Sequence, residues 1–258
     1  MMLKTNLRII AEKYSPLTGP LLLLLLWFIV STSHLASTTL LPGIGNTCEK
    51  IYEIVSSGNI YPNLVSTFIR TLTGFVLSVL FAVPLGIYLG AQPKIYKMFQ
   101  GIIEFFRSLP ATAMFPLFLL AFGIGDGSKI AIAWFISFWI ILVNSAYGVL
   151  HGSRTRNKVA QSFSATGWQI LRKVTFMDAL PQIFIGLKIG LSLSLIAVVV
   201  SEMFIGSNSG LGQKIYDSYL TYEISSLYAW LIITGILGYV MNVLFSRLER
   251  GTIHWVGK

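Results

Sequence analysis

Charged residues are scarce in this chain of 258 residues, and cysteine is almost absent. Only 11% of the residues are Asp, Glu, Lys or Arg, against about 25% in an ordinary soluble domain. Cys48 is the sole cysteine, so the chain cannot form an internal disulfide. His34, His151 and His254 lie far apart without ligand spacing, so we expect no metal site and no bound cofactor.

The motifs of an ATPase and of other enzymes are also missing. The stretch GIGDGSK, residues 123–129, has the wrong glycine spacing for the P-loop pattern G-x-x-x-x-G-K-[ST], and we expect it to form a turn. No Ser/His/Asp triad or paired-carboxylate site can be assembled at one depth from so few polar residues. The sequence therefore predicts a protein that is not an enzyme by itself.

Long apolar segments dominate the sequence, in which 54% of the residues are hydrophobic. Several windows reach the roughly 20 apolar residues that cross about 30 Å of hydrocarbon, and they lack the alternation of a barrel strand. We therefore predict an all-α polytopic membrane protein with about six transmembrane helices. The expected spans are residues 17–36, 64–90, 108–124, 129–150, 181–205 and 226–246. The first span resembles a secretory signal, but His34 fits the cleavage rule badly, so we expect it to remain uncleaved.

Lys and Arg are distributed unevenly between the two sides of such a bundle. With the N-terminus inside, fourteen fall in cytoplasmic segments and three outside. The cytoplasmic set is Lys4, Arg8, Lys13, Lys94, Lys97, Arg107, Arg154, Arg156, Lys158, Arg172, Lys173, Arg247, Arg250 and Lys258, and the external set is Lys50, Lys129 and Lys214. Because cytoplasmic loops carry such an excess, we predict that both termini are cytoplasmic. The net charge of +9 then reflects contact with anionic membrane lipid, and we expect no nucleic-acid binding.

A polar segment, residues 151–180, separates the fourth and fifth predicted spans. Val159, Phe163, Ile170 and Val174 recur at spacings compatible with one helical face, which predicts a short amphipathic helix on the cytosolic surface. Such a helix either lies on lipid or docks a soluble partner, and the periodicity does not separate these two interpretations.

Two ionisable residues of opposite charge, Arg70 and Glu202, lie at similar depth within their predicted spans. A pair between them could gate a translocation path or meet an anionic substrate, or it could simply hold two helices together. Ser194 and Ser201 share the fifth span with several glycines. We predict that this span lines the path or contacts a second subunit, with helix packing alone as the alternative.

Residues 160–212, AQSFSATGWQILRKVTFMDALPQIFIGLKIGLSLSLIAVVVSEMFIGSNSGLG, resemble the permease subunit of binding-protein-dependent ABC importers. They are most similar to the branch that takes up nitrate, sulfonate, taurine, bicarbonate and thiamin precursors. The resemblance runs from about residue 64 to the C-terminus and includes RSLPATAMFPLFLLAFGIGDGSKI and RLERGTIHW. It implies a type I ABC importer permease fold in a bacterial inner membrane. Residues 1–63 would form the N-terminal cytosolic segment, first span and external loop, and residues 64–258 the permease core.

In these permeases the cytosolic loop carries a signature that begins Glu-Ala-Ala, has a glycine a few residues later and closes with Leu-Pro. The matching residues here are Ala160, Leu180 and Pro181. Lys158 and Val159 stand where the acidic residue and first alanine are expected, and Ser164 stands at the glycine.

The resemblance implies that residues 151–180 contain a coupling helix that docks on a cytosolic ABC ATPase, with Phe163 and Trp168 at the contact. Alternatively, Trp168 only anchors the loop at the membrane interface, where tryptophan is common. A further implication is that Gly210, Leu211 and Gly212 belong to an external loop near the docking face of a solute-binding protein.

The function implied is that of a permease subunit that provides the path for a small solute, such as nitrate, a sulfonate, taurine or bicarbonate. Its partners would be two ATPase subunits, a second permease in a homodimer or heterodimer, and the external binding protein. Two alternatives remain open, an ATP-independent secondary transporter and a membrane anchor that assembles other proteins. Six spans without an obvious inverted repeat are few for the former, and the charges within spans argue against the latter.

Overall fold

The computed structural model describes residues 18–33 and 40–253, and all regular secondary structure among them is helical. In chain order the elements are a helix Thr18–Thr32, α2 Ile44–Ser56, α3 Ile60–Ala91, α4 Pro93–Ser108, the 3₁₀ helix η1 Ala111–Met114, α5 Phe115–Phe122, α6 Asp126–Leu150, α7 Arg154–Ser162, α8 Gly167–Ile170, the π-helix η2 Leu171–Thr175, α9 Phe176–Ile205, α10 Leu211–Leu220 and α11 Ile224–Thr252. The all-α prediction is confirmed.

The chain divides into two compact units. The first comprises Met1–Asn59 and Ile215–Ile233, and the second comprises Ile60–Lys214 and Thr234–Lys258. The functional division predicted at residue 63 stays a prediction.

Trp27 organises the described part of the first unit. Its Nε1 donates a hydrogen bond to the carbonyl of Pro42 at 3.0 Å, and its ring lies 5.9 Å from that of Tyr228. The Tyr228 hydroxyl donates to the carbonyl of Leu40 at 3.1 Å. These contacts tie the helix Thr18–Thr32 to the segment that follows it and to the start of α11.

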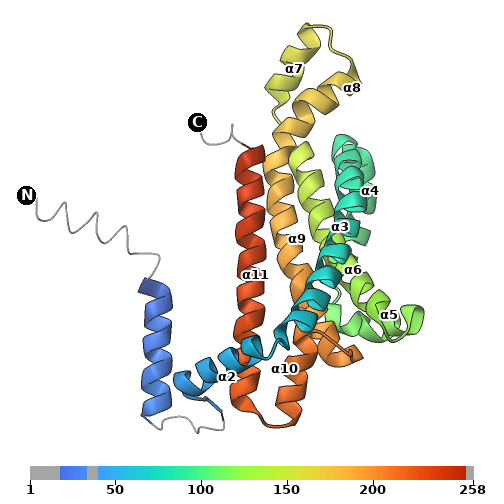
Figure 1. The fold of residues 1–258 in the computed structure, drawn as a ribbon. Helices are drawn as coiled ribbons and strands as arrows, with labels where there is room; N and C mark the ends of the chain where they lie inside the picture. Colours follow the sequence, from blue (N-terminus) through green and yellow to red (C-terminus); the bar gives the residue numbers. More distant parts are fainter. Residues whose placement is uncertain (1–17, 34–39, 254–258) are drawn as a thin grey trace, which may run out of the picture. The chain divides into compact units, whose positions relative to one another are not determined.

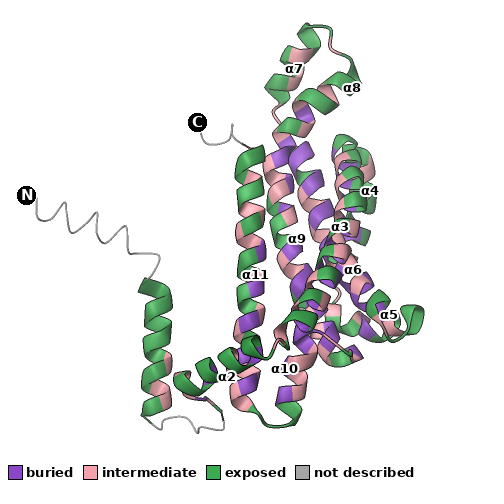
Figure 2. Ribbon diagram, viewed as in Figure 1, coloured by how far each residue is buried: buried purple, intermediate pink, exposed green. Residues whose placement is uncertain are grey.

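Three helices, α3, α6 and α9, pack side by side and form the centre of the second unit (Figure 1). Buried residues concentrate along α6 and α9, whereas the outer sides of α3 and α4 are exposed, as expected for surfaces that face lipid (Figure 2). Small residues allow the close approach, because a Cβ at Gly86 would lie 2.6 Å from the Leu142 carbonyl oxygen. Serine hydroxyls bridge the helices, with Ser78 donating to the Trp134 carbonyl at 2.8 Å and Ser137 to that of Gly190 at 3.1 Å.

Four helices are long and apolar enough to cross a membrane, namely Ile60–Ala91, Asp126–Leu150, the continuous helix Gly167–Ile205 and Ile224–Thr252. They confirm helices at the second, fourth, fifth and sixth predicted spans. The first predicted span is described only as the shorter apolar helix Thr18–Thr32. The other residues of this span lie outside the described residues. The same holds for the N-terminal basic residues Lys4, Arg8 and Lys13 and for Lys258 in the tail.

The third span differs from the prediction of one segment at residues 108–124. Instead, Pro93–Ser108 and Ala111–Phe122 form a pair bent by 90°. The break falls at Leu109 and Pro110, which both have extended backbone. Because proline disfavours a helical conformation at the residue before it, the dipeptide ends α4 and redirects the chain. The predicted start of this span is too late, because Lys94, Lys97 and Arg107 interrupt the apolar run of α4.

Candidate functional site

A polar stripe on α3 starts the candidate site. Asn63, Thr67 and Arg70 follow one another at helical spacing, so their side chains share a face. All three residues are buried, and Arg70 is only 6% exposed. Because a polar group buried in an apolar bundle needs partners, this face is expected to meet other polar groups.

Those groups come from Glu202, near the end of α9, which is fully buried. Its Oε1 accepts a hydrogen bond from Arg70 Nη1 at 2.6 Å, and its Oε2 accepts one from the backbone N–H of Gly212 at 2.9 Å. The Thr67 hydroxyl lies 2.9 Å from Oε2 and 3.0 Å from Oε1, so the two oxygens share its proton. The structure thus contains the Arg70–Glu202 ion pair that the sequence left open.

Arg70 also binds a second carboxylate, that of Asp126 at the start of α6. Its Nε donates to Asp126 Oδ1 at 2.8 Å, and its Nη2 lies 2.7 Å from the same oxygen. The Nη1 group faces the other way and also donates to the carbonyl of Ser209 at 2.7 Å. The guanidinium therefore has an inner edge held by Glu202 and an outer edge held by Asp126, whose side chain is 64% exposed.

The GSNSGLG segment, residues 206–212, is fastened to α3 through its backbone. The N–H of Gly210 donates to Asn63 Oδ1, and the N–H of Leu211 donates to Thr67 Oγ1, both at 2.9 Å. Gly210 has a φ of 147°, and a Cβ there would collide with the Glu202 carboxylate. A Cβ at Gly212 would collide with the carbonyl of Val199. Glycine is therefore required at both positions for the backbone to reach the carboxylate.

A polar cavity of about 310 Å³ opens beside this ion pair. Its lining comprises Arg70, Ile124, Gly125, Asp126, Lys129, Gly206, Ser207, Asn208 and Ser209. Lys129 is 1% exposed, and its Nζ donates to the carbonyl of Gly125 at 3.3 Å. The sequence placed Lys129 among the external charges, and the structure buries its side chain in the first turn of α6.

Ser194 and Ser201, predicted to line a path, lie elsewhere on α9 and are fully buried within the single chain. The Ser194 hydroxyl donates to the carbonyl of Thr71 on α3 at 2.9 Å, and that of Ser201 donates to Val198 at 2.8 Å. The first contact joins α9 to α3, the second lies within α9, and the path-lining role stays a prediction.

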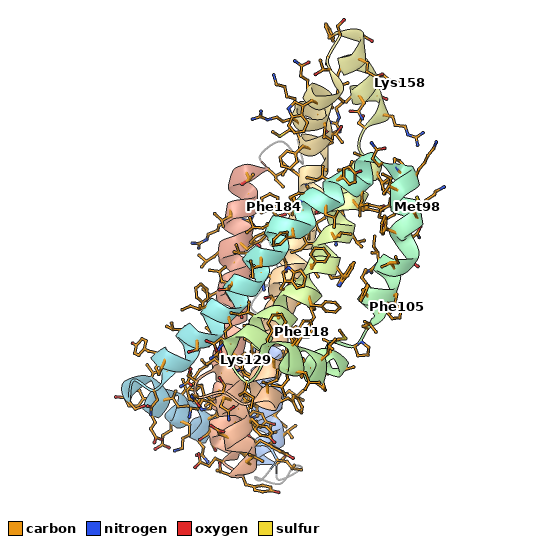
Figure 3. The ribbon with its side chains drawn as sticks, turned by 90° about the vertical axis from the view of Figure 1, so that its right-hand side faces the viewer. Met98, Phe105, Phe118, Lys129, Lys158 and Phe184 are labelled. Carbon is orange, nitrogen blue, oxygen red and sulfur yellow. The ribbon has the colours of Figure 1, made fainter. Side chains whose placement is uncertain are left out.

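The residues predicted to couple to a partner lie at the other end of the second unit, where α7 and α8 project from the bundle (Figure 1). In Figure 3, Lys158 on α7 and Lys129 lie at opposite ends of this unit. Phe163 and Trp168 are 83% and 68% exposed. Ala160 is half-buried on α7, Leu180 is buried, and Pro181 lies inside α9 rather than at its start.

The prediction of a single amphipathic helix through residues 159–174 is wrong, because α7 ends at Ser162 and α8 begins at Gly167. The N–H of Ala165 donates to the Ala160 carbonyl and that of Ser164 to the Gln161 carbonyl, which is a Schellman arrangement. Ser164 has a φ of 57°, the left-handed conformation that favours glycine. Ser164 thus adopts a backbone conformation that glycine would adopt without strain.

Asp178, on the first turn of α9, closes this projecting hairpin. Its Oδ1 lies 3.0 Å from Arg156 Nη2 of α7, and its Oδ2 accepts the N–H of Ser153 at 3.2 Å. Asp178 therefore holds the start of α7 against α9.

The second unit defines the class of protein, an all-helical membrane-spanning bundle with a polar ion network at one end and a projecting hairpin at the other. Residues 82–254 match the family of the binding-protein-dependent transport system inner membrane component. The chain belongs to this family.

Named relatives and a solved structure agree with this assignment. The chain is 29% identical to the taurine transport system permease protein TauC of Escherichia coli, covering 92% of this chain and 87% of TauC. It is 28% identical to the bicarbonate transport system permease protein CmpB of Synechococcus elongatus, covering 91% and 87%. A chain of the inward-facing MetNI methionine ABC transporter superposes with a TM-score of 0.65 at 22% identity, covering 73% of this chain and 94% of that chain. The predicted type I ABC importer permease fold is confirmed.

Sequence reasoning brought Arg70, Glu202 and the glycine-rich segment to one end without seeing that they form one network. It did not assign Asp126 or Lys129 to this site, because GIGDGSK was interpreted only as a turn. The signal for Asn63 and Thr67 was present, since they recur with Arg70 on one face of an apolar helix.

Proposed function

We propose that this chain is the permease subunit of an ATP-driven importer and that the α7–α8 hairpin is its contact with a separate ATPase. The observation that carries the proposal is the exposed pair Phe163 and Trp168 on a hairpin that projects from the bundle. Large aromatic side chains left exposed on a projecting element are characteristic of protein contacts. The family membership supplies the class of partner.

The hairpin end carries the basic residues that indicate a cytoplasmic location. Arg154, Arg156 and Lys158 lie on α7, and Arg172 and Lys173 lie on η2. Cytoplasmic segments of membrane proteins are enriched in Lys and Arg, so this end faces the cytoplasm and the Arg70 network faces outside. The sequence prediction that both termini are cytoplasmic is part of this proposal.

Coupling requires that the two states of the ATPase contact the hairpin differently, because a partner that binds both states equally shifts no equilibrium. A second permease copy would complete the translocation path. A solute-binding protein would deliver the solute at the end with Gly210, Leu211 and Gly212. Arg70 and Glu202 would close that end as a gate, since their contacts join α3, α9 and the segment 206–212.

The solute that we propose is a small anion of the sulfonate, taurine, nitrate or bicarbonate class. The names of the relatives TauC and CmpB support this class. The chain's own support is the buried Arg70 at the outer end of the path.

The test is co-purification from native membranes in mild detergent, followed by identification of the accompanying proteins. Wild type is compared with the double variant Phe163→Asp, Trp168→Asp. We expect a P-loop ATPase to accompany wild type and to be lost from the double variant. Loss should be specific to the hairpin, because neither side chain supports the core.

Tyr222→Asp is the matched control. Tyr222 is 84% exposed, and its φ of 57° is one that aspartate tolerates, so the variant adds one exposed negative charge, half that of the double variant, away from the hairpin. The ATPase should remain bound to this control and to Phe163→Tyr, Trp168→Phe. If wild type brings down no ATPase at any salt concentration, the importer proposal fails.

A further inference from the structure

We propose that the cavity beside Arg70 is a binding site for a small oxyanion, a sulfonate or carboxylate, which takes the place of Asp126 on the outer edge of the guanidinium. The inference rests on the proposed function, because an anion in this cavity matters only if the chain forms a transport path. It assigns to Asp126 the role of an internal stand-in for the substrate's anionic group.

The contact between Arg70 and Asp126 leaves room for a better ligand. Both Nε and Nη2 of Arg70 contact the same oxygen, Asp126 Oδ1, at 2.8 and 2.7 Å. Arginine binds oxyanions best through two parallel hydrogen bonds to two different oxygens. A sulfonate or carboxylate that approached this edge could form both bonds, and the exposed Asp126 side chain could swing away into solvent.

Lys129 supplies a second cation in the same cavity. Its ammonium group is buried, and the hydrogen bond that it makes within the described structure goes to a neutral carbonyl, that of Gly125, at a long 3.3 Å. An ammonium group carries three donors, so further acceptors can be accommodated. A buried cation next to a polar cavity is stabilised by an anion that enters it.

The charges around the cavity allow an external anion to replace Asp126, but not Glu202. Glu202 is fully buried and held by Arg70, Thr67 and Gly212, so it stays in place. With Asp126 displaced, Arg70 and Lys129 face Glu202 alone, and the cavity carries one net positive charge. A monovalent oxyanion restores neutrality.

The size and lining of the cavity fit such a ligand. About 310 Å³ is at the lower end of ligand pockets, which span roughly 300–1,000 Å³. Ser207, Asn208 and Ser209 provide polar groups from the glycine-rich segment, and the wall contains few apolar side chains. The cavity therefore suits a compact, strongly polar group rather than a large apolar one.

The test measures thermal unfolding of the full chain in lipid nanodiscs with ethanesulfonate as the probe. Dimethyl sulfone serves as the neutral analogue, at equal ionic strength. Ethanesulfonate should raise the unfolding midpoint of wild type, whereas dimethyl sulfone should not. In Asp126→Asn the half-saturating concentration of ethanesulfonate should fall about tenfold, because the competing internal carboxylate is gone.

Three further variants complete the design. Lys129→Met should lose the response to ethanesulfonate, and Lys129→Arg should retain it. Glu53→Gln removes an exposed carboxylate that is paired with Lys50 at 2.7 Å, so it controls for net charge and should respond as wild type does.

The proposal is overturned if wild type and Asp126→Asn respond to ethanesulfonate no more than to dimethyl sulfone. It is also overturned if Asp126→Asn and Glu53→Gln shift the response equally. The gain expected in Asp126→Asn keeps the test decisive even if Lys129→Met does not fold. Since no ATPase is present, failure here leaves the co-purification result untouched, and the two proposals fail separately.

Discussion

Arg70 on α3 and Glu202 on α9 form a buried ion pair, with Nη1 of the arginine 2.6 Å from Oε1 of the glutamate. The pair does not stand alone, because Glu202 also accepts the backbone N–H of Gly212 and Arg70 also holds Asp126. Each buried charge is thus compensated by more than one group. The network joins α3, α6, α9 and the glycine-rich segment at one end of the bundle.

Loss of Arg70 should be the most damaging single change in this network. Arg70→Met leaves Glu202 buried without its cation, and breaking a buried pair in this way costs about 3–5 kcal/mol. Asp126→Asn should cost no more than about 1 kcal/mol, because Asp126 is largely exposed. Thermal unfolding in nanodiscs measures both. Equal destabilisation by the two variants would contradict the assignment of inner and outer edges.

Gly212→Ala should destabilise the protein by about 1–3 kcal/mol, since the added methyl group meets the Val199 carbonyl and the Glu202 Cβ. The matched control is Gly101→Ala in the interior of α4, where nothing lies within 4 Å of the new methyl group. That control should gain up to about 1 kcal/mol from helix propensity. Relative to wild type, the free energy of unfolding measured by chemical or thermal denaturation should therefore fall in Gly212→Ala and rise in Gly101→Ala.

Ser164→Gly should stabilise the hairpin by about 1 kcal/mol, because it removes the cost of a left-handed conformation at a residue with a Cβ. Ser162→Gly, in the last turn of α7, is the control and should destabilise the same helix. Hydrogen exchange of residues 154–166 distinguishes the two variants, and we expect slower exchange in Ser164→Gly than in wild type. Faster exchange in Ser164→Gly would show that the serine makes a contact worth more than the strain.

Asp178→Ala should loosen α7, since it removes both the partner of Arg156 and the acceptor for the Ser153 N–H. Arg156→Gln should have a smaller effect, below about 1 kcal/mol, because Arg156 is mostly exposed. Hydrogen exchange of α7 is the readout. If both variants accelerate exchange equally, the ion pair rather than the backbone contact holds the helix.

The spans that the sequence predicted well are those where apolar residues run without interruption, as in α3, α6, α9 and α11. The bent pair was placed too late, because the charges on α4 mask an apolar face and Pro110 suggests a kink within a span rather than a boundary between two helices. The hairpin was misjudged for a different reason. The spacing of Val159, Phe163 and Ile170 is compatible with one helical face. Hydrophobic periodicity, however, carries no information on the left-handed residue Ser164, which follows the end of α7 and precedes Ile170.

The site was predictable only in part. Arg70 and Glu202 stood out because charges within apolar spans are costly. Asp126 did not, because an exposed acidic residue in a turn has no distinguishing pattern until folding brings it to α3. The need for glycine at Gly210 and Gly212 likewise depends on the distance between a loop and a carboxylate, which no local pattern encodes.

The helix Gly167–Ile205 runs unbroken through 39 residues, from the exposed ring of Trp168 to the buried carboxylate of Glu202. At 1.5 Å per residue these two side chains are about 50 Å apart along a single rod. A tilt of the helix at one end must displace the other end, unless the helix bends where its backbone hydrogen bonding is altered. Such flexing would be absorbed at the π-helical turn Leu171–Thr175 and at Pro181, both within the N-terminal half of the helix. The part of the helix after Pro181 would then move as a rigid body, so the position of Glu202 would depend on the orientation that a partner imposes at the hairpin.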